Sequence, residues 1–439
     1  MTDTDVSAAE PAQDAAATEP VEHKPRSFRA ALRSAEFDAR LAGMLIALAI
    51  IWIVFQIVTP RHTFITPRNL WNLSVQTSVV AIMATGMVLI IVTRNIDLSV
   101  GASMAVVGMA MAVVQHDWLP EWIGFDHPLT WVICVVLGLA LGAAIGAFQG
   151  AIVAYVGVPS FIVTLGGFLV WRGLAWWVAS GQTIAPMDSN FRLLGGGAEG
   201  TIGGTWSWIL GVLACVGIVV LQFTKRRQRA RYGFGLRPMW AEIALGVVSC
   251  GAVLGAIAFL NRYYLPPALA EQRGQAGQNI SLGLAYPVLI AIAVAVLMTF
   301  LATRRRFGRY VYSIGGNPEA AELAGIKTKR TIVRTFTLMG LLVGLAAAVQ
   351  IARLNAAVSS LGTGMELNVI AAAVIGGTSF TGGIGTIAGA VLGALVMQSL
   401  VSGMVLMGIE APIQDIVVGI VLVLAVTLDT ILRRRTDSS

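Results

Sequence analysis

The chain has 439 residues, of which 56% are hydrophobic and 12% are charged, and its formal net charge is +7 at pH 7. A soluble domain carries about 25% charged residues, so this chain lacks the charge to cover a water-facing surface. Lipid admits only helices and closed barrels, and the apolar residues here form continuous runs without the alternation of barrel strands. We therefore predict an all-α polytopic membrane protein. The basic residues lie in short loops, where they set topology, so no nucleic-acid partner is expected.

The predicted elements begin after a polar segment. Residues 1–40 are expected to be disordered at first and then to form a basic cytoplasmic N-terminal tail. A membrane span needs about 20 apolar residues. The runs that approach this length are 41–59, 75–93, 98–115, 130–154, 160–179, 207–223, 240–260, 286–302, 332–352, 367–380, 386–408 and 412–432. The run 367–380 is short and interrupted by glycine, so it is either a crossing or a re-entrant half-helix.

Lysine and arginine gather in three clusters, at residues 225–231, 304–330 and 433–435. All three fall on the cytoplasmic side if the N-terminus is cytoplasmic, as the positive-inside rule requires. Both termini are then cytoplasmic and the number of crossings is even, which fits about twelve transmembrane segments. The transmembrane domain is expected to cover residues 41–432, followed by a cytoplasmic tail at 433–439.

The cytoplasmic loop 303–331 contains a short predicted helix with both ends specified. Asn317 suits the N-cap, Pro318 the first helical position and Gly325 the left-handed position after the last turn. So short a helix is marginal by itself and needs a support. Either it lies on the protein's own surface, or its small residues dock as a coupling helix in a groove on a cytoplasmic ATPase. The candidate coupling residues are Asn317, Pro318, Glu319, Ala320, Ala321, Glu322, Leu323, Ala324 and Gly325.

Polar residues also interrupt the apolar runs at two places. Residues 94–101 are either a functional segment, since polar groups near a span are costly, or a tight turn in which Asp97 caps the helix that begins at Leu98. Residues 366–385 include glycines at 376, 377, 382, 383 and 385, a poor helix interior. With the region of Gly101 they form either a pair that marks a transport pathway or sites of close helix packing.

Arg172 lies inside the run 160–179, beside Trp171. It is expected to pair with a partner, to stack on an indole or to help line a pathway. The candidate pathway residues are Asn95, Asp97, Ser99, Arg172, Asn368, Thr378 and Ser379.

Motifs for catalysis and metal binding are missing from the chain. It has no GxxxxGK[ST] phosphate loop, so it cannot bind ATP in the P-loop manner. Its three cysteines and four histidines show no metal-ligand spacing, so no metal site is predicted. If the chain moves a solute with the energy of ATP, another subunit must supply that energy.

Four segments resemble the ribose/xylose/arabinose-type permeases of ABC sugar importers. They are IDLSVG at 96–101, VPSFIVTLGG at 158–167, GRYVYSIGGNPEAAELAGI at 308–326 and IAAAVIGGTSFTGGIGT at 370–386. The resemblance covers roughly residues 41–432. It is greatest to the xylose-type members, which have a similar extra helical pair at 207–260, divided here by an Arg-rich loop at 224–239. Asn95 and Asn368 depart from the family pattern, which commonly has Gly or Glu at the first position and Asp at the second.

The resemblance implies a non-enzymatic permease subunit in a bacterial inner membrane, with two halves related as inverted repeats. It implies a second permease copy, cytoplasmic ABC ATPase subunits and a periplasmic sugar-binding protein as partners, besides membrane lipid. No cofactor is expected on this chain, because ATP and Mg would bind to the ATPase. D-xylose is the expected cargo, and another sugar, a nucleoside or a branched-chain amino acid are the alternatives. An ion-coupled secondary transporter is the alternative from another class, but the predicted spans hold almost no acidic or histidine residues.

Overall fold

The computed structural model describes residues 39–124, 126–234, 236, 238–272 and 278–437. Almost all of the predicted N-terminal tail lies outside these residues. The described chain is built from helices joined by turns and a few isolated β-bridges. Its helices are α2 (Ala39–Val58), α3 (Pro67–Val92), α4 (Val100–Val113), α5 (Leu119–Ile123), α6 (Thr130–Ala151), α7 (Ser160–Val178), α8 (Ser189–Arg192), α9 (Gly203–Arg231), α10 (Met239–Leu260), α11 (Pro267–Gln272), α12 (Tyr286–Arg304), α13 (Arg306–Gly316), α14 (Pro318–Leu323), α15 (Thr328–Leu354), α16 (Met365–Ile375), α17 (Ile387–Leu406) and α18 (Ala411–Asp437).

Each predicted run contains a helix, and nine helical segments in the described chain are long and apolar enough to cross a membrane. These are Pro67–Val92, Val100–Ile123, Thr130–Val156, Ser160–Val178, Gly203–Arg231, Met239–Leu260, Tyr286–Arg304, Thr328–Leu354 and Ile387–Leu406. The second and third include π-helical turns, η2 (Val114–Trp118) and η3 (Ile152–Val156). The apolar helices in α2, α16 and α18 are shorter. The prediction of a polytopic helical membrane protein is therefore confirmed at this level.

Several predicted boundaries were wrong. Helix α3 begins at Pro67, eight residues before the predicted start at 75, because Thr66 accepts a hydrogen bond from the backbone N–H of Asn69 and Pro67 suits the first position. Helix α16 ends at Ile375 and not at 380, since Gly377 adopts a left-handed φ of 88°. Residues 224–231 and 433–437 belong to helices α9 and α18, where a loop and a tail were predicted. Lysine, arginine and glutamine are good helix formers, so a helix easily continues beyond the apolar run.

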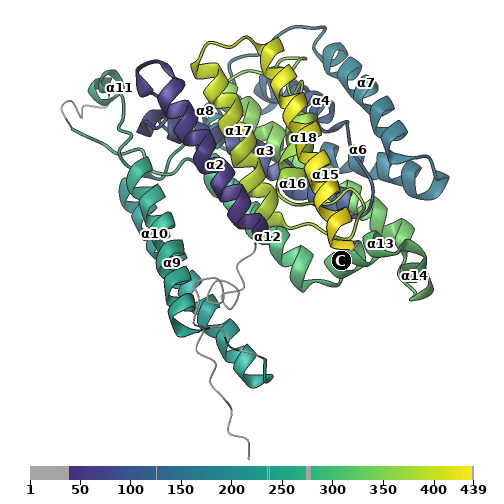
Figure 1. Cartoon of the computed structure of the whole chain (residues 1–439). Helices are drawn as coiled ribbons and strands as arrows, with labels where there is room; N and C mark the ends of the chain where they lie inside the picture. Colours follow the sequence, from purple (N-terminus) through teal and green to yellow (C-terminus); the bar gives the residue numbers. More distant parts are fainter. Residues whose placement is uncertain (1–38, 125, 235, 237, 273–277, 438–439) are drawn as a thin grey trace, which may run out of the picture.

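Helix α3 lies at the centre of the bundle, and 94% of its most apolar stretch of 18 residues is buried inside the protein. Helices α12, α15, α16 and α17 pack around it, while α9 and α10 form a hairpin that stands apart at one side (Figure 1). An ion pair between Arg226 and Glu242, 2.7 Å long, joins the two helices of this hairpin. Helices α13 and α14 lie at one end of the bundle, and α8 and α11 lie at the other (Figure 1). We call these the α14 end and the α8 end.

Helices α6 and α15 approach one another at backbone distance. Added Cβ atoms on Gly142 or Gly146 would collide with backbone carbonyl oxygens of α15, and one on Gly340 would collide with the carbonyl oxygen of Gly142. Glycine every fourth residue in α6, from Gly138 to Gly150, makes this contact possible. Gln149, which contacts one of the polar segments described next, belongs to this closely packed helix pair.

Candidate functional site

Helix α14 has the predicted caps. The Asn317 side-chain oxygen accepts a hydrogen bond of 3.0 Å from the backbone N–H of Ala320, and Pro318 is the first helical residue. Gly325 has a φ of 79°, so the left-handed C-terminal turn is also present. These contacts are local in sequence, and they hold α14 together as a separate short helix.

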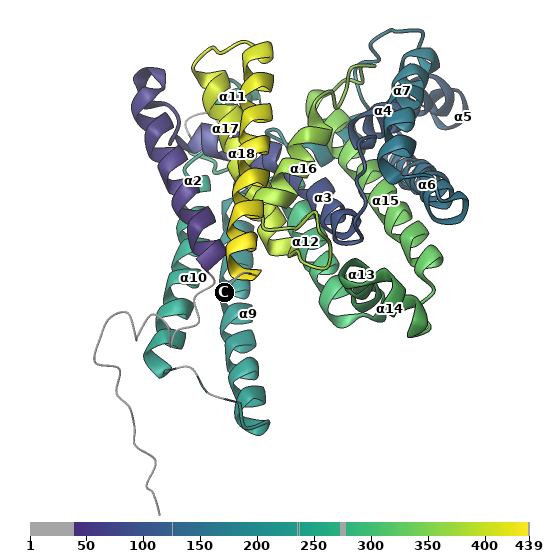
Figure 2. The ribbon, with the colours of Figure 1, turned by 45° about the vertical axis from the view of Figure 1, so that its right-hand side comes forward.

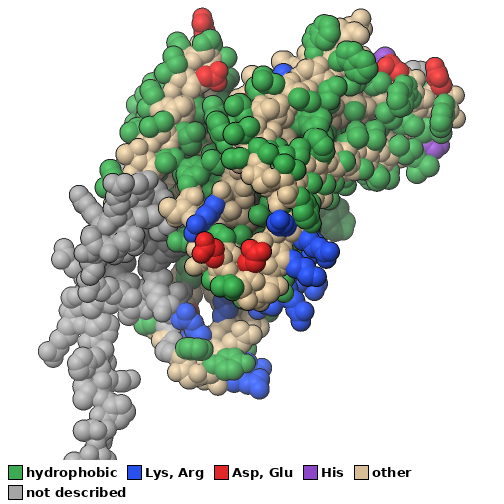
Figure 3. Space-filling model, turned by 90° about the vertical axis from the view of Figure 1, so that its right-hand side faces the viewer, with side chains coloured by type: hydrophobic (Ala, Val, Ile, Leu, Met, Phe, Trp, Pro, Cys, Tyr) green, Lys and Arg blue, Asp and Glu red, His purple; other side chains and the backbone are tan. Residues whose placement is uncertain are grey.

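The two apolar residues Ala321 and Leu323 of α14 face in different directions. Ala321 is only 4% exposed and faces the protein's own helices, whereas Leu323 is 90% exposed. Helix α14 therefore rests on its own chain through Ala321 and presents Leu323, with Glu319 and Glu322, to the outside. Lys and Arg side chains gather around this end of the molecule (Figure 3).

The sequence reasoning missed helix α13, which precedes α14. Its buried residues include Val311 and Ile314, three apart, and Gly315. This spacing is the signal that could have revealed it, although Gly308 and the pair Gly315 and Gly316 obscured the pattern. The Tyr312 hydroxyl donates a hydrogen bond of 2.7 Å to the carbonyl oxygen of Gly385, which ties α13 to the glycine-rich loop after α16.

A second polar feature is the non-helical break between α3 and α4. Asp97 is buried, and its Oδ1 accepts hydrogen bonds from the backbone N–H of Ser99 at 2.9 Å and from its hydroxyl at 2.6 Å. Helix α4 begins at Val100 with Ser99 as N-cap, so the prediction that Asp97 caps a helix from Leu98 was wrong by two residues. The Ser99 hydroxyl also lies 3.0 Å from Oε1 of Gln149 on α6, so one proton serves two acceptors.

Gln149 and Trp171 bring two unpartnered donors to this region. Gln149 is 2% exposed, and its Nε2 has no hydrogen-bond partner among the described residues. The same is true of the indole Nε1 of Trp171. A Cβ on Gly167 would collide with Gln149 Nε2 and lie 3.1 Å from Trp171 Nε1, so both donors lie close to this glycine. Buried donors without partners are costly and are usually found where a ligand or water completes them.

Arg172 is bound mainly to backbone carbonyls. Its Nη1 donates to the carbonyl oxygens of Ser359 at 3.0 Å and Leu361 at 2.8 Å, and its guanidinium lies 5.7 Å from the ring centre of Phe168. Of its three predicted roles, a partner is present: the hydrogen bonds go to backbone carbonyls, and the carboxylate of Glu366 on α16 is near enough to interact with its charge. Its Nη2 and Oε2 of Glu366 on α16 are buried without partners in the described chain.

The two glycine regions, at Gly101 and at residues 376–385, do not contact each other through Gly101. A Cβ on Gly101 would collide with Glu366 Oε2 and with the carbonyl oxygen of Gly362, so Gly101 meets the start of α16 and not the loop 376–385. The contact at Gly101 is close packing that brings the first turn of α4 against the start of α16, and the pathway interpretation stays a prediction.

The predicted pathway residues fall in two groups. Asp97, Ser99, Arg172 and Asn368 belong to the region where α4, α7 and α16 begin or pack, and Asn368 Oδ1 is another buried acceptor without a described partner. Asn95 donates to the carbonyl and hydroxyl oxygens of Thr93, and Ser379 bonds to Thr381 at 2.7 Å, so these two stabilise turns. Thr378 is buried in the same glycine-rich turn as Ser379.

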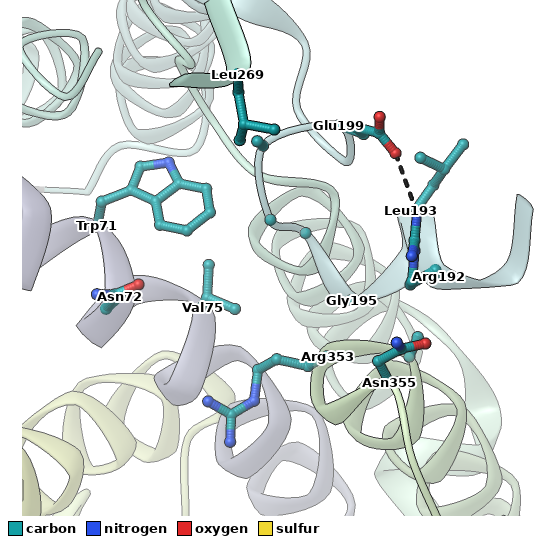
Figure 4. A pocket seen from close by; sticks show the side chains of 14 residues that line it. Trp71, Asn72, Val75, Arg192, Leu193, Gly195, Glu199, Leu269, Arg353 and Asn355 are labelled. Carbon is teal, nitrogen blue, oxygen red and sulfur yellow. Dashed lines mark hydrogen bonds and ion pairs between the residues drawn. The ribbon is translucent and has the colours of Figure 1, made fainter. Parts of the chain in front are cut away.

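A cavity of about 510 Å³ opens at the α8 end (Figure 4). It lies between the start of α3, the end of α15 and the loop after α8. Its polar side chains are Asn72, Arg353 and Asn355, with an Arg192–Glu199 ion pair of 3.4 Å at its edge. The indole N–H of its one tryptophan, Trp71, is already used by the carbonyl oxygen of Gly283 at 2.8 Å.

Comparison with known proteins assigns the chain to a family. Residues 69–426 match the family described as branched-chain amino acid transport system/permease component. The chain belongs to this family. It is therefore a permease component rather than an enzyme, and a multi-pass protein of the bacterial inner membrane.

Among its relatives, the xylose transport system permease protein of Haemophilus influenzae is 37% identical over 387 residues, which is 88% of this chain and 95% of the relative. The corresponding protein of Escherichia coli is 37% identical over 393 residues, covering 90% of this chain and 92% of the relative. The ribose import permease protein of Escherichia coli is 32% identical over 385 residues, covering 88% and 92%. No solved structure matches the chain.

Proposed function

We propose that this protein is the membrane-spanning subunit of an ATP-driven monosaccharide importer, with D-xylose as its cargo. The observation that carries the proposal is the 37% identity to xylose permeases over 88–90% of the chain. The lower identity of 32% to ribose permeases makes ribose the second candidate. The capped helix α14 supports ATP as the energy source, since an ATPase partner needs such a contact.

In this proposal the α14 end is cytoplasmic and the α8 end faces the periplasm. The lysine and arginine clusters at residues 225–231 and 304–330 support this orientation. Helices α2 and α18 then begin and end on the cytoplasmic side, and the chain has twelve transmembrane segments. The shortest, α16, completes its crossing together with residues 355–364. Backbone of this kind is tolerated at membrane depth where protein surrounds it.

The two broken segments support an arrangement as inverted repeats. One break follows α3 and leads into α4, and the other follows α15 and leads into α16. They enter from opposite ends of the bundle, and their helices meet where Gly101 packs against Gly362. Discontinuous helices that meet near the middle of the membrane are typical of substrate sites in transporters with such repeats.

We place the sugar pathway beside this meeting point. A monosaccharide carries hydroxyl groups that both donate and accept hydrogen bonds. The unpartnered donors Gln149 Nε2, Trp171 Nε1 and Arg172 Nη2, and the unpartnered acceptors Glu366 Oε2 and Asn368 Oδ1, offer both kinds of partner. Helices α7 and α18 lie on either side of this region (Figure 2), and both expose apolar side chains. We propose that a second copy of the chain covers this face in a homodimer.

The remaining partners follow from this arrangement. Cytoplasmic ATPase subunits would bind ATP and Mg and would seat α14 with its exposed Leu323. A periplasmic binding protein would deliver sugar to the α8 end, where the 510 Å³ cavity lies.

Uptake of labelled D-xylose in cells that lack this gene, with and without the gene restored, tests the proposal. Unlabelled ribose, arabinose and glucose serve as competitors, and one arm depletes ATP. We expect ATP-dependent uptake that returns with the gene and is reduced by unlabelled xylose. Restored uptake of ribose instead would replace xylose as cargo, and uptake that survives ATP depletion but stops with an uncoupler would replace the ABC class by an ion-coupled transporter.

The pathway assignment has its own test. Replacing Gln149 by Leu removes one donor to the sugar, so we expect xylose uptake to fall roughly two- to tenfold at low sugar concentration. Gln222→Leu, on the separate α9–α10 hairpin, is the matched control. Equal effects of the two variants would contradict the pathway assignment and leave the importer class untouched.

A further inference from the structure

Three segments far apart in the sequence meet in one junction at the α14 end. We define this junction as residues 92–94 after α3, residues 312–316 at the end of α13 and residues 382–385 in the glycine-rich loop. The carbonyl oxygen of Val92 accepts a hydrogen bond of 3.0 Å from the backbone N–H of Gly383. A Cβ on Gly315 would collide with both of these groups, so glycine is required where the three segments cross.

Arg94 is the side chain that joins the break to α13. Its Nε donates to the carbonyl oxygen of Gly315 at 2.9 Å, and its Nη2 donates to that of Gly316 at 2.7 Å. These are the last two residues of α13, whose final carbonyls have no partner inside the helix. The planar guanidinium fits two adjacent acceptors and its charge complements the negative end of the helix. Arg94 itself has a left-handed φ of 62°, so the surrounding contacts hold its backbone in a rarely adopted conformation.

The chain continues from Arg94 directly into the proposed pathway. Two residues later, the backbone N–H of Ile96 donates to the Ser160 hydroxyl at the start of α7, at 3.2 Å. Asp97 and Ser99 follow, and Ser99 contacts Gln149. Residues 95–99 belong to no helix or turn, so this part of the break lacks the continuous backbone hydrogen bonding of the helices on either side and can be displaced more easily than they can.

We propose that Arg94 is a positioning residue that couples movement of α13 and α14 to the break at residues 93–99. This inference rests on the proposed function, because it needs an ATPase that moves α14. When α14 is displaced, α13 moves with it, and the two hydrogen bonds from Arg94 pull the break and change the position of Asp97 and Ser99 beside Gln149. The loop at 382–385 keeps the junction in register through its bonds to Val92 and Tyr312.

The test uses the complete transporter, with the permease, its ATPase and its binding protein reconstituted in lipid vesicles. The variants are Arg94→Ala, Arg94→Lys and, as control, Arg334→Ala, which removes an exposed arginine of α15. Three quantities are measured for each: the amount of ATPase that copurifies with the permease, the rate of ATP hydrolysis and the number of sugars imported per ATP hydrolysed.

We expect Arg94→Ala to keep the bound ATPase and its hydrolysis but to import about tenfold fewer sugars per ATP, since both charge-assisted bonds are lost. Lysine can donate to only one of the two carbonyls at a time, so Arg94→Lys should recover part of the ratio. The control should match the wild type. An unchanged ratio would overturn the proposal, whether import and hydrolysis both stay normal or both fall in parallel. A failure of both Arg94 variants to assemble would also overturn it, because that result points to a structural role. A wild-type transporter that imports no sugar would instead contradict the proposed function.

Discussion

The contact between α6 and α15 gives the sharpest prediction for stability. A Cβ on Gly142 would overlap the carbonyl oxygen of Gly340, lie 3.0 Å from its carbonyl carbon and lie 3.1 Å from the backbone nitrogen of Gly344. All three atoms are backbone, so none can rotate aside, and the helices must separate by about 1 Å to restore ordinary contact. A gap of 0.5–1 Å already removes a quarter to a half of the dispersion energy of the atoms involved.

We expect Gly142→Ala to destabilise the protein by about 1–3 kcal/mol, the usual range for an overpacked core, and Gly142→Leu by more. The matched control is Gly217 on α9, where an added Cβ meets nothing within 4 Å. Alanine there should be neutral or stabilising by up to about 1 kcal/mol, because glycine is a poor helix former.

The assay is the midpoint of thermal unfolding of the purified protein in one detergent, followed by size-exclusion chromatography of heated samples. The reasoning predicts a lower midpoint for both Gly142 variants and an unchanged or higher one for Gly217→Ala. If Gly142→Leu unfolds at the same temperature as Gly217→Leu, the close approach of α6 and α15 is refuted.

Three further predictions concern other parts of the molecule. Ala321→Glu buries a charge beneath α14, so sugar import should be lost while membrane insertion is retained, and normal uptake at normal abundance would contradict this. The sulfur atoms of Cys215 and Cys250 each lie within 3.9 Å of the other residue's carbonyl oxygen, so a membrane-permeant oxidant should link the two residues by a disulfide. After protease cleavage between α9 and α10, the linked fragments should stay together under non-reducing conditions, and two separate fragments would argue against the hairpin. Desolvation raises the pKa of Asp188 in the loop before α8. Hydrogen bonds from backbone N–H groups lower this pKa in part, and the nearby Asp126 carboxylate raises it further. The folded state therefore favours protonated Asp188, its stabilisation is lost as pH rises through that raised pKa, and Asp188→Asn, which keeps the helix cap, should flatten the loss of thermal stability above pH 4.

Features that depend on neighbouring residues could be predicted from the sequence. Asn317, Pro318 and Gly325 specify the ends of α14 through contacts of three or four residues, and all were correctly assigned. The long apolar runs gave the spans for the same reason, since hydropathy is a property of each segment. The direction in which α14 faces was not predictable, because Ala321 and Leu323 are both apolar and only the position of α13 and α15 decides which one is buried.

Features that depend on distant residues left no local pattern. Nothing around Arg94 indicates that its partners are Gly315 and Gly316, more than 200 positions away. The glycines of the loop 376–385 were recognised as turn-forming, but their partners at Val92 and Arg94 became visible only in the structure. A glycine in the sequence indicates that another segment approaches closely, but it does not indicate which segment.

The unpartnered polar groups were found only by combining the sequence with the contacts between distant residues. Gln149 lies in a run whose composition indicates an ordinary membrane helix, so the sequence offered no reason to select it. Glu366 begins the segment that was selected for its glycines, and its carboxylate was not selected. The structure selects them because both have a buried polar atom without a hydrogen-bond partner in the described chain, and Glu366 lies beside the contact of Gly101 with Gly362. Such groups are costly unless a solute completes them for part of the transport cycle. Arg94 contacts the end of α13, and the break that follows it contains Ser99, which contacts Gln149. In the proposed function, this one short break would therefore link the movement of α14 to the groups that meet the cargo.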